Sequence, residues 1–387
     1  MKKKLLQIGI EVNSGSTGKI AEQIGSLAIK KGFESYITYA RGFNPSQSNI
    51  IKIGNNFNIF LHVIRTRFLA DHLNGSKLAT LRLIKKIKKI KPDIIHLHQI
   101  HGYYINIPIL FIYLKSSNIP ILWTIHDDWA FSEIPFGNYP KSLFFDKSKY
   151  NLNKKKKIFT SLVNLKLIGV SKWISELAKK SFLNNYSIST ISNGVDLSIF
   201  YPRNNNKNIL KKFNLNPKKK YLIATGTTWN ENKGIIDYKK LSKILPENII
   251  LLLVGINDKK MFAYETNIKC FSRTENQDEL AELYSISEIL LCLSYKESFG
   301  LTPVEAMSCG TPSIVYDNTA LVELLTKDTG TIVKTGDVLM VLEAIKEILS
   351  QKKKTYSDYC VKRANKYYDK NKTYEKYIEE YNKLLKI

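Results

Sequence analysis

Residues 297–312 read ESFGLTPVEAMSCGTP, a stretch that carries two glutamates on either side of a predicted turn. Thr302 is expected to cap a helix that begins at Pro303, because both residue types favour these positions. Glu305 would then lie in the first turn, and the backbone N–H groups of residues 299–302 would be free to bind an anion. The pattern predicts a diphosphate on the helix N-terminus, with a carboxylate binding ribose hydroxyls beside it. The alternative is an acidic loop before a surface helix.

The surroundings of this stretch indicate a doubly wound α/β fold. It follows the apolar run Ile289–Leu293, which is typical of a buried parallel strand. The same alternation of a short apolar run with a helical pattern begins at Leu5–Val12 and continues along most of the chain. Because 387 residues are too many for one ordinary core, we expect two Rossmann-like domains that face each other across a cleft.

Composition excludes several classes of protein and leaves the partner open. With 44% hydrophobic and 24% charged residues the chain is an ordinary globular one, and its four cysteines lack the spacing of a metal or disulfide framework. No apolar run is long enough to cross a membrane, and the N-terminus lacks a signal-peptide core, so we expect a cytoplasmic protein. The net charge of +25 fits nucleic acid, an anionic membrane or an anionic substrate.

A lysine-rich helix predicted at residues 78–90 bears on which of these anionic partners the chain binds. Its apolar side chains recur at helical spacing, and its lysines read either as a solvated face or as a contact with the anionic inner leaflet. No nucleic-acid-binding motif accompanies the charge, so no nucleic-acid partner is predicted.

The stretch at 297–312 resembles the donor-binding signature of glycosyltransferase family 4, whose members are retaining enzymes of the GT-B fold. The resemblance implies that Glu305 binds the ribose of a nucleotide-sugar and that Glu297 lies near the transferred sugar. The backbone amides that it implies in contact with sugar and phosphate are those of Phe299, Gly300, Leu301 and Thr302.

The resemblance also suggests how the chain is divided. The polar, Asn- and Lys-rich residues 202–217 are interpreted as the linker. We place an acceptor-side domain at residues 1–202, completed by a C-terminal helix at 371–387 as in the family. The donor domain then occupies residues 203–370.

A second match to the family follows the first strand of that donor domain. Residues 225–234 read TGTTWNENKG, and a departing diphosphate needs a cation such as Lys233 at this place. The family usually carries an arginine four residues before the lysine, where this chain has Trp229. Lys233 is therefore predicted to work with another cation, or Trp229 marks a subgroup. The alternative is a solvated lysine at the start of a helix.

The predicted acceptor-side domain carries two further matches. The turn at residues 14–18, SGSTG, faces the donor phosphate in the family, and Gly15 would let the backbone approach it closely. Residues 126–131, HDDWAF, resemble the HDxWxF of bacterial surface-polysaccharide transferases and follow a predicted strand. By this resemblance His126 contacts the donor sugar, and Asp127 is a weaker candidate for an acceptor hydroxyl.

Together these matches predict a retaining glycosyltransferase with His126, Glu297 and Lys233 as its catalytic residues. It would move a sugar from a UDP- or GDP-type donor to a glycan or polyprenyl-linked glycan in capsule, lipopolysaccharide or exopolysaccharide synthesis. No metal or other cofactor is expected, because the chain has no spaced DxD pair in cleft context and the clustered histidines at 96, 98 and 101 lack a ligand set. The alternatives are a nucleotide-sugar epimerase on a similar fold and a non-catalytic nucleotide-sugar or nucleic-acid binder.

Overall fold

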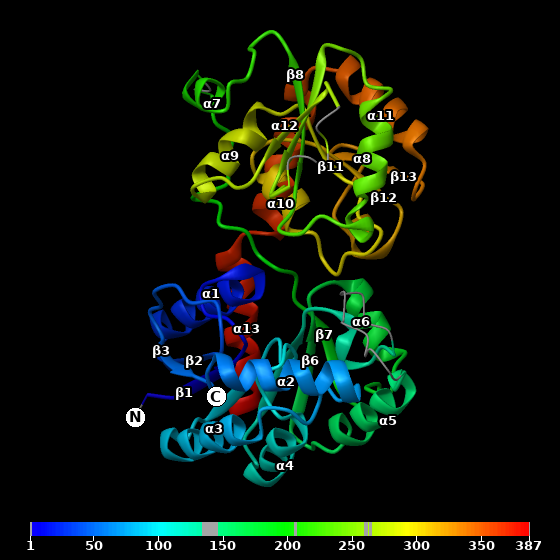
Figure 1. The fold of residues 1–387 in the computed structure, drawn as a ribbon. Coiled ribbons are helices and arrows are strands. Elements are labelled where there is room, and N and C mark those ends of the chain that lie inside the picture. Colours follow the sequence, from blue (N-terminus) through cyan, green and yellow to red (C-terminus); the bar gives the residue numbers. More distant parts are fainter. Residues whose placement is uncertain (1, 134–145, 205–206, 259–261, 263–264, 387) are drawn as a thin grey trace. The chain divides into compact units, whose positions relative to one another are not determined.

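The fold is described from a computed structural model that covers residues 2–133, 146–204, 207–258, 262 and 265–386 (Figure 1). Contacts divide the chain into two compact units. Unit 1 contains the residues up to Asn193 and again those from Thr373 onward, and unit 2 contains Gly194–Lys372. Each unit is built around one parallel sheet, so the predicted pair of doubly wound α/β domains is confirmed as a fold class.

Unit 1 has a sheet in the order β3-β2-β1-β4-β5-β6-β7 within its described residues, and every pairing in it is parallel. The register sets Leu5 opposite Ile94 and Ile95 opposite Ile121. The strands are β1 (Lys4–Ile8), β2 (Glu34–Tyr39), β3 (Asn49–Lys52), β4 (Ile94–Leu97), β5 (Ile121–Ile125), β6 (Leu165–Gly169) and β7 (Ser187–Thr190).

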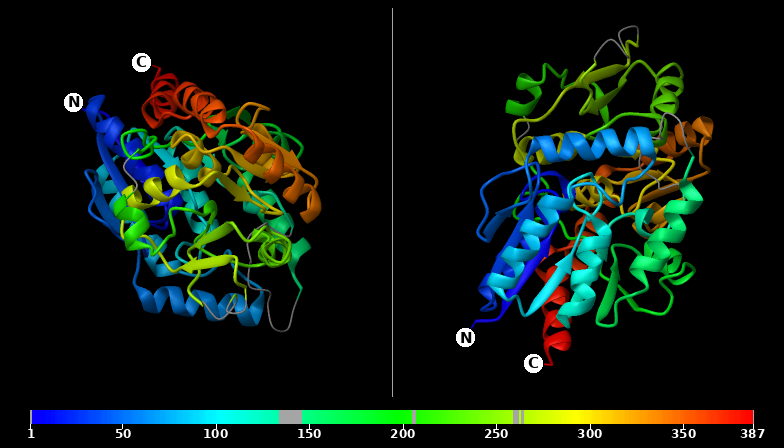
Figure 2. Two further views of the ribbon diagram at one scale, coloured as in Figure 1. Left: turned by 90° about the horizontal axis from the view of Figure 1, so that it is seen from above. Right: turned by 60° about the horizontal axis from the view of Figure 1, so that its bottom comes forward.

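Helices cover both faces of this sheet (Figure 2). On one face α1 and the C-terminal helix α13 share a core with the strands, where Tyr374, Tyr377 and Tyr381 are buried. On the other face Phe111 of α4 and Phe159 of α5 pack against Trp123. The helices are α1 (Gly15–Lys30), α2 (Asn56–Leu69), α3 (Lys77–Ile90), α4 (Ile107–Ser117), η1 (Asp128–Ala130), α5 (Ser148–Phe159), α6 (Lys172–Lys179) and α13 (Lys370–Leu385).

Unit 2 repeats the plan, with parallel strands in the order β10-β9-β8-β11-β12-β13 among its described residues. These are β8 (Lys220–Thr225), β9 (Ile249–Val254), β10 (Ile268–Phe271), β11 (Ile289–Cys292), β12 (Ser313–Tyr316) and β13 (Gly330–Val333). The helices are α7 (Lys207–Lys212), η2 (Glu231–Lys233), α8 (Ile235–Ser242), α9 (Gln277–Ile286), α10 (Leu301–Ser308), η4 (Thr319–Glu323), α11 (Val338–Ser350) and α12 (Lys353–Tyr367).

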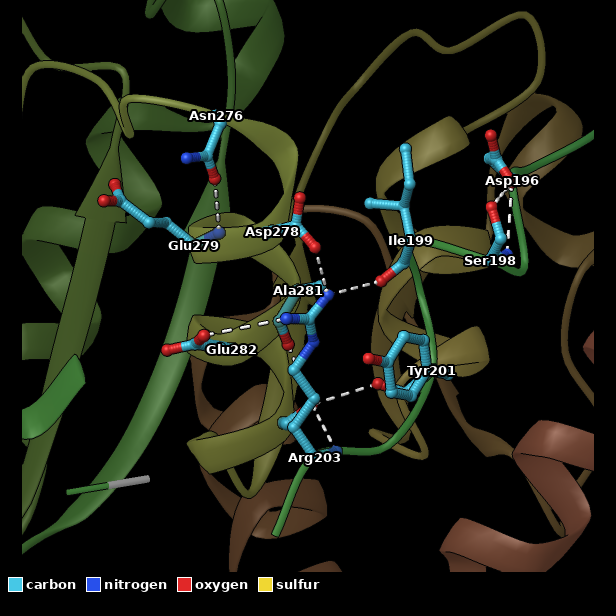
Figure 3. Close-up of polar contacts among 11 residues, drawn as sticks. Asp196, Ser198, Ile199, Tyr201, Arg203, Asn276, Asp278, Glu279, Ala281 and Glu282 are labelled. Atoms are coloured by element: carbon cyan, nitrogen blue, oxygen red, sulfur yellow. Dashed lines mark hydrogen bonds and ion pairs between the residues drawn. The ribbon is translucent and has the colours of Figure 1, made fainter. Parts of the chain in front are cut away.

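The stretch that we interpreted as a linker, 202–217, is structured where it is described, so that interpretation is wrong. It contains α7, whose Ile209 is 2% exposed, and a buried apolar side chain fixes the segment to unit 2. Arg203 donates to a carboxylate oxygen of Asp278 at 2.7 Å and to the carbonyl of Ile199 at 2.8 Å (Figure 3). Residues 205–206 lie outside the described residues.

Residues 194–202, which we placed with the first domain, make their contacts in unit 2. Val195 forms a bridge with Asp369, and its backbone N–H donates to the carbonyl of Tyr368 at 2.7 Å. The carboxylate of Asp196 binds the ammonium of Lys370. It also accepts hydrogen bonds from the backbone N–H and the hydroxyl of Ser198 (Figure 3). The chain therefore leaves unit 1 and returns to it through two segments that are bonded to each other.

Candidate functional site

The predicted anion-binding turn in unit 2 is formed by Gly300 at the start of α10. Gly300 has φ +97°, and a Cβ added to it would lie 2.7 Å from Cδ2 of Leu321. Glycine adopts this left-handed backbone conformation readily. Gly300 is the N-cap, and the helix therefore begins at Leu301. The expectation that Thr302 caps a helix beginning at Pro303 is therefore wrong. Proline is tolerated at the third position because no helical hydrogen bond is required of its nitrogen there.

Glu305 lies in the second turn of α10 and contacts a tyrosine that sequence reasoning missed. The hydroxyl of Tyr284 donates to Oε2 of Glu305 at 3.1 Å and lies 3.0 Å from Oγ1 of Thr225 at the end of β8. Burial raises the pKa of Tyr284 well above its usual value, so it remains a hydrogen-bond donor. Tyr284 lies in the apolar pattern of α9, and the pattern alone indicates only a core residue. Its partner Glu305 comes from a different helix.

Lys233 and Glu297 meet in the folded unit, although 64 residues separate them. Nζ of Lys233 lies 2.5 Å from Oε2 of Glu297, and the two side chains are 34% and 21% exposed. Burial works against the charged ammonium, but the neighbouring carboxylate of Glu297 outweighs it and raises the pKa of Lys233. The pair is therefore charged and partly open to solvent, which lets an anionic ligand compete for the ammonium.

Backbone hydrogen bonds hold both members of this ion pair. The side chain of Asn230 accepts from the N–H of Lys233 at 3.2 Å, and Gly234 follows with φ +71°. A Cβ at Gly234 would lie 2.1 Å from the carbonyl oxygen of Leu293. The N–H of Glu297 donates to Oγ1 of Thr319 at 3.2 Å. These contacts place the two charges at the carboxyl ends of β8 and β11, which are neighbouring strands.

Trp229, which stands where the family usually has an arginine, is partly buried and packs against the core of unit 2. Its indole N–H donates to the carbonyl of Val254 at 3.3 Å, and its ring meets Tyr238 edge-on at 5.5 Å. Trp229 therefore contributes apolar contact and no charge. Phe299 is likewise a packing residue, 4% exposed and edge-on to Tyr368 at 6.0 Å.

In unit 1 the predicted residues His126 and Asp127 border a small pocket. It is lined by His98, Gln99, Ile100, His101, Trp123, Thr124, Ile125, His126, Asp127, Trp129 and Ala130. Oδ1 of Asp127 accepts from the N–H of Trp129 at 3.0 Å and caps η1, and Oδ2 lies 3.2 Å from Nε2 of His101. Asp127 therefore organises the pocket wall through both of its oxygens.

The buried Lys155 holds the loop that contains Trp129 and Ser132. Lys155 is 2% exposed, and Nζ donates to the carbonyls of Trp129 and Ser132 at 2.7 and 2.8 Å. Burial lowers the pKa of Lys155 to about 8, against the opposing attraction of Asp128 and Asp127. Sequence reasoning could not find Lys155, because it lies in a run of four lysines whose other members are exposed or half-buried.

His126 follows β5 and is hydrogen-bonded to a second histidine. Its Nε2 lies 3.1 Å from Nδ1 of His98. Burial lowers the pKa of His126 to about 4, although Asp127 works in the opposite direction, so the ring is neutral at pH 7.

Gly15, the predicted phosphate-facing glycine, is the first residue of α1 with φ +60°, and a Cβ there would lie 2.2 Å from a carboxylate oxygen of Glu11.

The described part of the chain contains neither a cluster suited to a metal ion nor a helix suited to span a membrane. Within it, no three His, Cys, Asp or Glu side chains are grouped in a way that could hold a metal ion. Among the same residues, no helix combines the length and the apolar composition that crossing a membrane requires.

Comparison with protein families assigns one model to each half of the chain. The model "Glycosyltransferase Family 4" matches residues 23–199, and "Glycosyl transferases group 1" matches residues 205–367. Together the two models span most of both units, and the second contains the Lys233–Glu297 pair and Glu305.

Curated relatives are bacterial enzymes. The chain is 30% identical over 173 residues to N-acetyl-alpha-D-glucosaminyl L-malate synthase of Bacillus anthracis, a match that covers 43% of this chain and 45% of that enzyme. The matched stretch thus spans less than half the length of that relative. Identity is 25% over 290 residues to UDP-Gal:alpha-D-GlcNAc-diphosphoundecaprenol alpha-1,3-galactosyltransferase of Escherichia coli, covering 70% of each chain.

Solved structures show the same architecture. Sucrose-phosphate synthase from Thermosynechococcus elongatus superposes with a TM-score of 0.76 at 16% identity, covering 99% of each chain. This likeness establishes the two-domain GT-B fold.

Proposed function

The chain belongs to the family 4 glycosyltransferases, and we propose that it transfers a sugar from a nucleotide-diphosphate donor to a glycan or lipid-linked glycan in bacterial surface-polysaccharide synthesis. The observation that carries the proposal is the charged Lys233–Glu297 pair, which lies on the strand ends next to the helix that holds Glu305. The named donor and acceptor of the Escherichia coli relative support the substrate classes, UDP-sugar and diphosphoundecaprenol-linked sugar.

In the proposed reaction, unit 2 binds the departing nucleotide. Negative charge grows on the diphosphate as the glycosidic bond breaks, and a preorganised ammonium stabilises that charge more than water does. Lys233 supplies the ammonium, and Glu297 holds it in place at 2.5 Å until a ligand arrives. Glu305 would accept hydrogen bonds from ribose hydroxyls while Tyr284 fixes its orientation. We propose retention of configuration, without a metal, on the strength of the family resemblance.

The test is a thermal-shift screen against UDP, GDP, ADP and their sugars. A ligand at about 100 times its Kd should stabilise the fold by roughly 2.7 kcal/mol. We expect one base to stabilise the protein, and Glu305→Ala to abolish that shift. Glu343→Ala, at an exposed position of α11, is the matched control and should keep it. A protein that no nucleotide stabilises would contradict the proposal.

A second measurement tests the chemistry itself. Incubation of the donor with a polyprenyl-diphosphate-linked sugar should release nucleotide diphosphate, and proton NMR of the product should show the anomeric configuration of the donor. Nucleotide release that does not depend on acceptor would contradict transfer, and interconversion of the donor sugar alone would indicate an epimerase. An inverted anomeric centre would refute retention only.

We further propose that unit 1 contacts an anionic membrane at the cytoplasmic face. One face of α2 exposes large apolar side chains instead of burying them: Phe57 63%, Phe60 57%, Leu61 47%, Ile64 37% and Phe68 48%. Helix α2 contains no acidic residue and carries Arg65 and Arg67, and α3 adds the lysine run predicted from sequence. An apolar stripe beside cations is the composition of a helix that lies in a membrane interface.

Vesicle flotation tests this contact. The protein should float with phosphatidylglycerol vesicles and remain behind with phosphatidylcholine alone, because the attraction combines apolar insertion with charge. Phe57→Ser with Phe60→Ser should reduce flotation, whereas Phe43→Ser, 51% exposed but outside α2, should not. Equal flotation of both variants would refute the assignment to α2.

A further inference from the structure

A chain of hydrogen bonds runs behind His126 across three neighbouring strands of unit 1. Gln7 lies on β1, His98 follows β4 and His126 follows β5. Oε1 of Gln7 lies 2.9 Å from Nε2 of His98, and Nδ1 of His98 lies 3.1 Å from Nε2 of His126. Gln7 and His98 are 0% and 3% exposed, so the hydrogen bond between these two side chains is shielded from water.

Gln7, at the buried end of this series of hydrogen bonds, determines which groups donate and which accept. The amide nitrogen of Gln7 donates to the backbone carbonyl of Ala21 in α1 at 2.9 Å. Turning the amide over would place its oxygen against that carbonyl, and two acceptors repel. Oε1 therefore faces His98. A carbonyl oxygen can only accept, so the proton of His98 must be on Nε2.

The same rule fixes the second ring. A neutral imidazole carries one N–H, so Nδ1 of His98 is an acceptor and Nε2 of His126 must donate to it. Burial, with His96 and His126 nearby, lowers the pKa of His98 well below its usual value, in keeping with a neutral ring. The remaining nitrogen of a neutral His126, Nδ1, is then left with its lone pair.

We propose that Gln7 and His98 are positioning residues, which hold His126 as the Nε2–H tautomer so that Nδ1 accepts a hydrogen bond from a substrate hydroxyl in the pocket that His126 lines. Naming the hydroxyl as that of a sugar rests on the proposed function, whereas the tautomer does not. His126 then binds and orients the substrate as an acceptor. It has no proton on Nδ1 to give to a leaving group.

Histidine-labelled full-length protein provides a direct test, because protonated and unprotonated ring nitrogens have well-separated ¹⁵N shifts. Two-bond ¹H–¹⁵N correlation should show His98 and His126 both protonated on Nε2, with assignments from His98→Asn and His126→Asn. In Gln7→Met the acceptor is lost, and both rings should move toward the Nδ1–H tautomer. Gln99→Met, which contacts His101 instead, should leave both rings unchanged.

Activity gives the second readout. Gln7→Met should lower kcat/KM by about tenfold, the equivalent of one hydrogen bond. Wild-type His126 protonated on Nδ1 would overturn the proposal even if Gln7→Met failed to fold. So would unchanged tautomers in a folded Gln7→Met. If the tautomers are as expected but no sugar transfer is found, the proposed function fails and the positioning chain stands.

Discussion

Mild acid should unfold unit 1 before unit 2, because the histidines of the chain are confined to unit 1. They are His62, His72, His96, His98, His101 and His126. Burial lowers the pKa of His72 from 6.5 to about 3 and that of His126 to about 4. It also lowers the pKa values of His96 and His98 well below 6.5.

The sign and size of the effect follow from proton uptake. In the unfolded chain a histidine takes up a proton near pH 6.5, whereas the buried rings of His72, His96, His98 and His126 resist protonation in the folded unit, so acid favours the unfolded state. The stability that these neutral rings contribute to unit 1 is fully present above pH 6.5, and it is lost as the pH falls from there toward the folded pKa. At pH 5 each such histidine costs about 2 kcal/mol, so His72 and His126 together cost roughly 4 kcal/mol. That is a large part of the roughly 5–15 kcal/mol that stabilises a typical domain.

The assay uses the distribution of tryptophans. Trp229→Phe leaves Trp123, Trp129 and Trp173, all in unit 1, so urea melts followed by fluorescence then report unit 1 alone. The urea midpoint of unit 1 should fall steeply between pH 7 and pH 5. Hydrogen exchange of β9 in the wild-type protein reports unit 2, and its protection, corrected for intrinsic rate, should change little over the same range. Equal losses in both units, or a constant midpoint for unit 1, would refute the reasoning.

Three further substitutions test the packing around the two sites. Gly300→Ala should destabilise unit 2 by about 1–3 kcal/mol, because alanine is strained at φ +97°, and a lower urea midpoint would show it. Tyr284→Phe removes the hydrogen bond to Glu305 and should weaken nucleotide binding by up to about tenfold in calorimetry, so unchanged affinity would contradict the orienting role. Lys155→Met removes the donor to the buried carbonyl of Trp129 and to the partly buried carbonyl of Ser132, and it should cost roughly 2–4 kcal/mol with faster hydrogen exchange around Trp129. Exchange at the wild-type rate would argue against its support of the loop.

The sequence predicted best those helices and strands whose residue pattern has a single structural explanation. The strand predicted at Ile289–Leu293 is β11, which ends one residue earlier at Cys292, and the helix predicted at residues 78–90 is α3 with one more residue, Lys77. Buried parallel strands read as apolar runs because both of their faces are covered. Helix α2 was not predicted, although its apolar residues recur at helical spacing, and the face that they form is exposed instead of buried in a core.

The site was harder to predict than the fold. The preference of threonine for caps favoured Thr302, but tertiary packing around a left-handed Gly300 decides where α10 begins. The ion pair between Lys233 and Glu297 and the contact between Tyr284 and Glu305 join separate elements, and no local pattern encodes such pairs.

The division of unit 1 into two separate stretches of the chain has a consequence for how the protein is made. Unit 2 is inserted between the main body of unit 1 and the helical segment that completes it. During translation the ribosome therefore releases all of unit 2 before Tyr381, the buried partner of His96 at 2.6 Å. Unit 2 can fold as one continuous piece, whereas the nascent unit 1 keeps an uncovered apolar face until α13 emerges. Chaperone contact during synthesis should concentrate on that face.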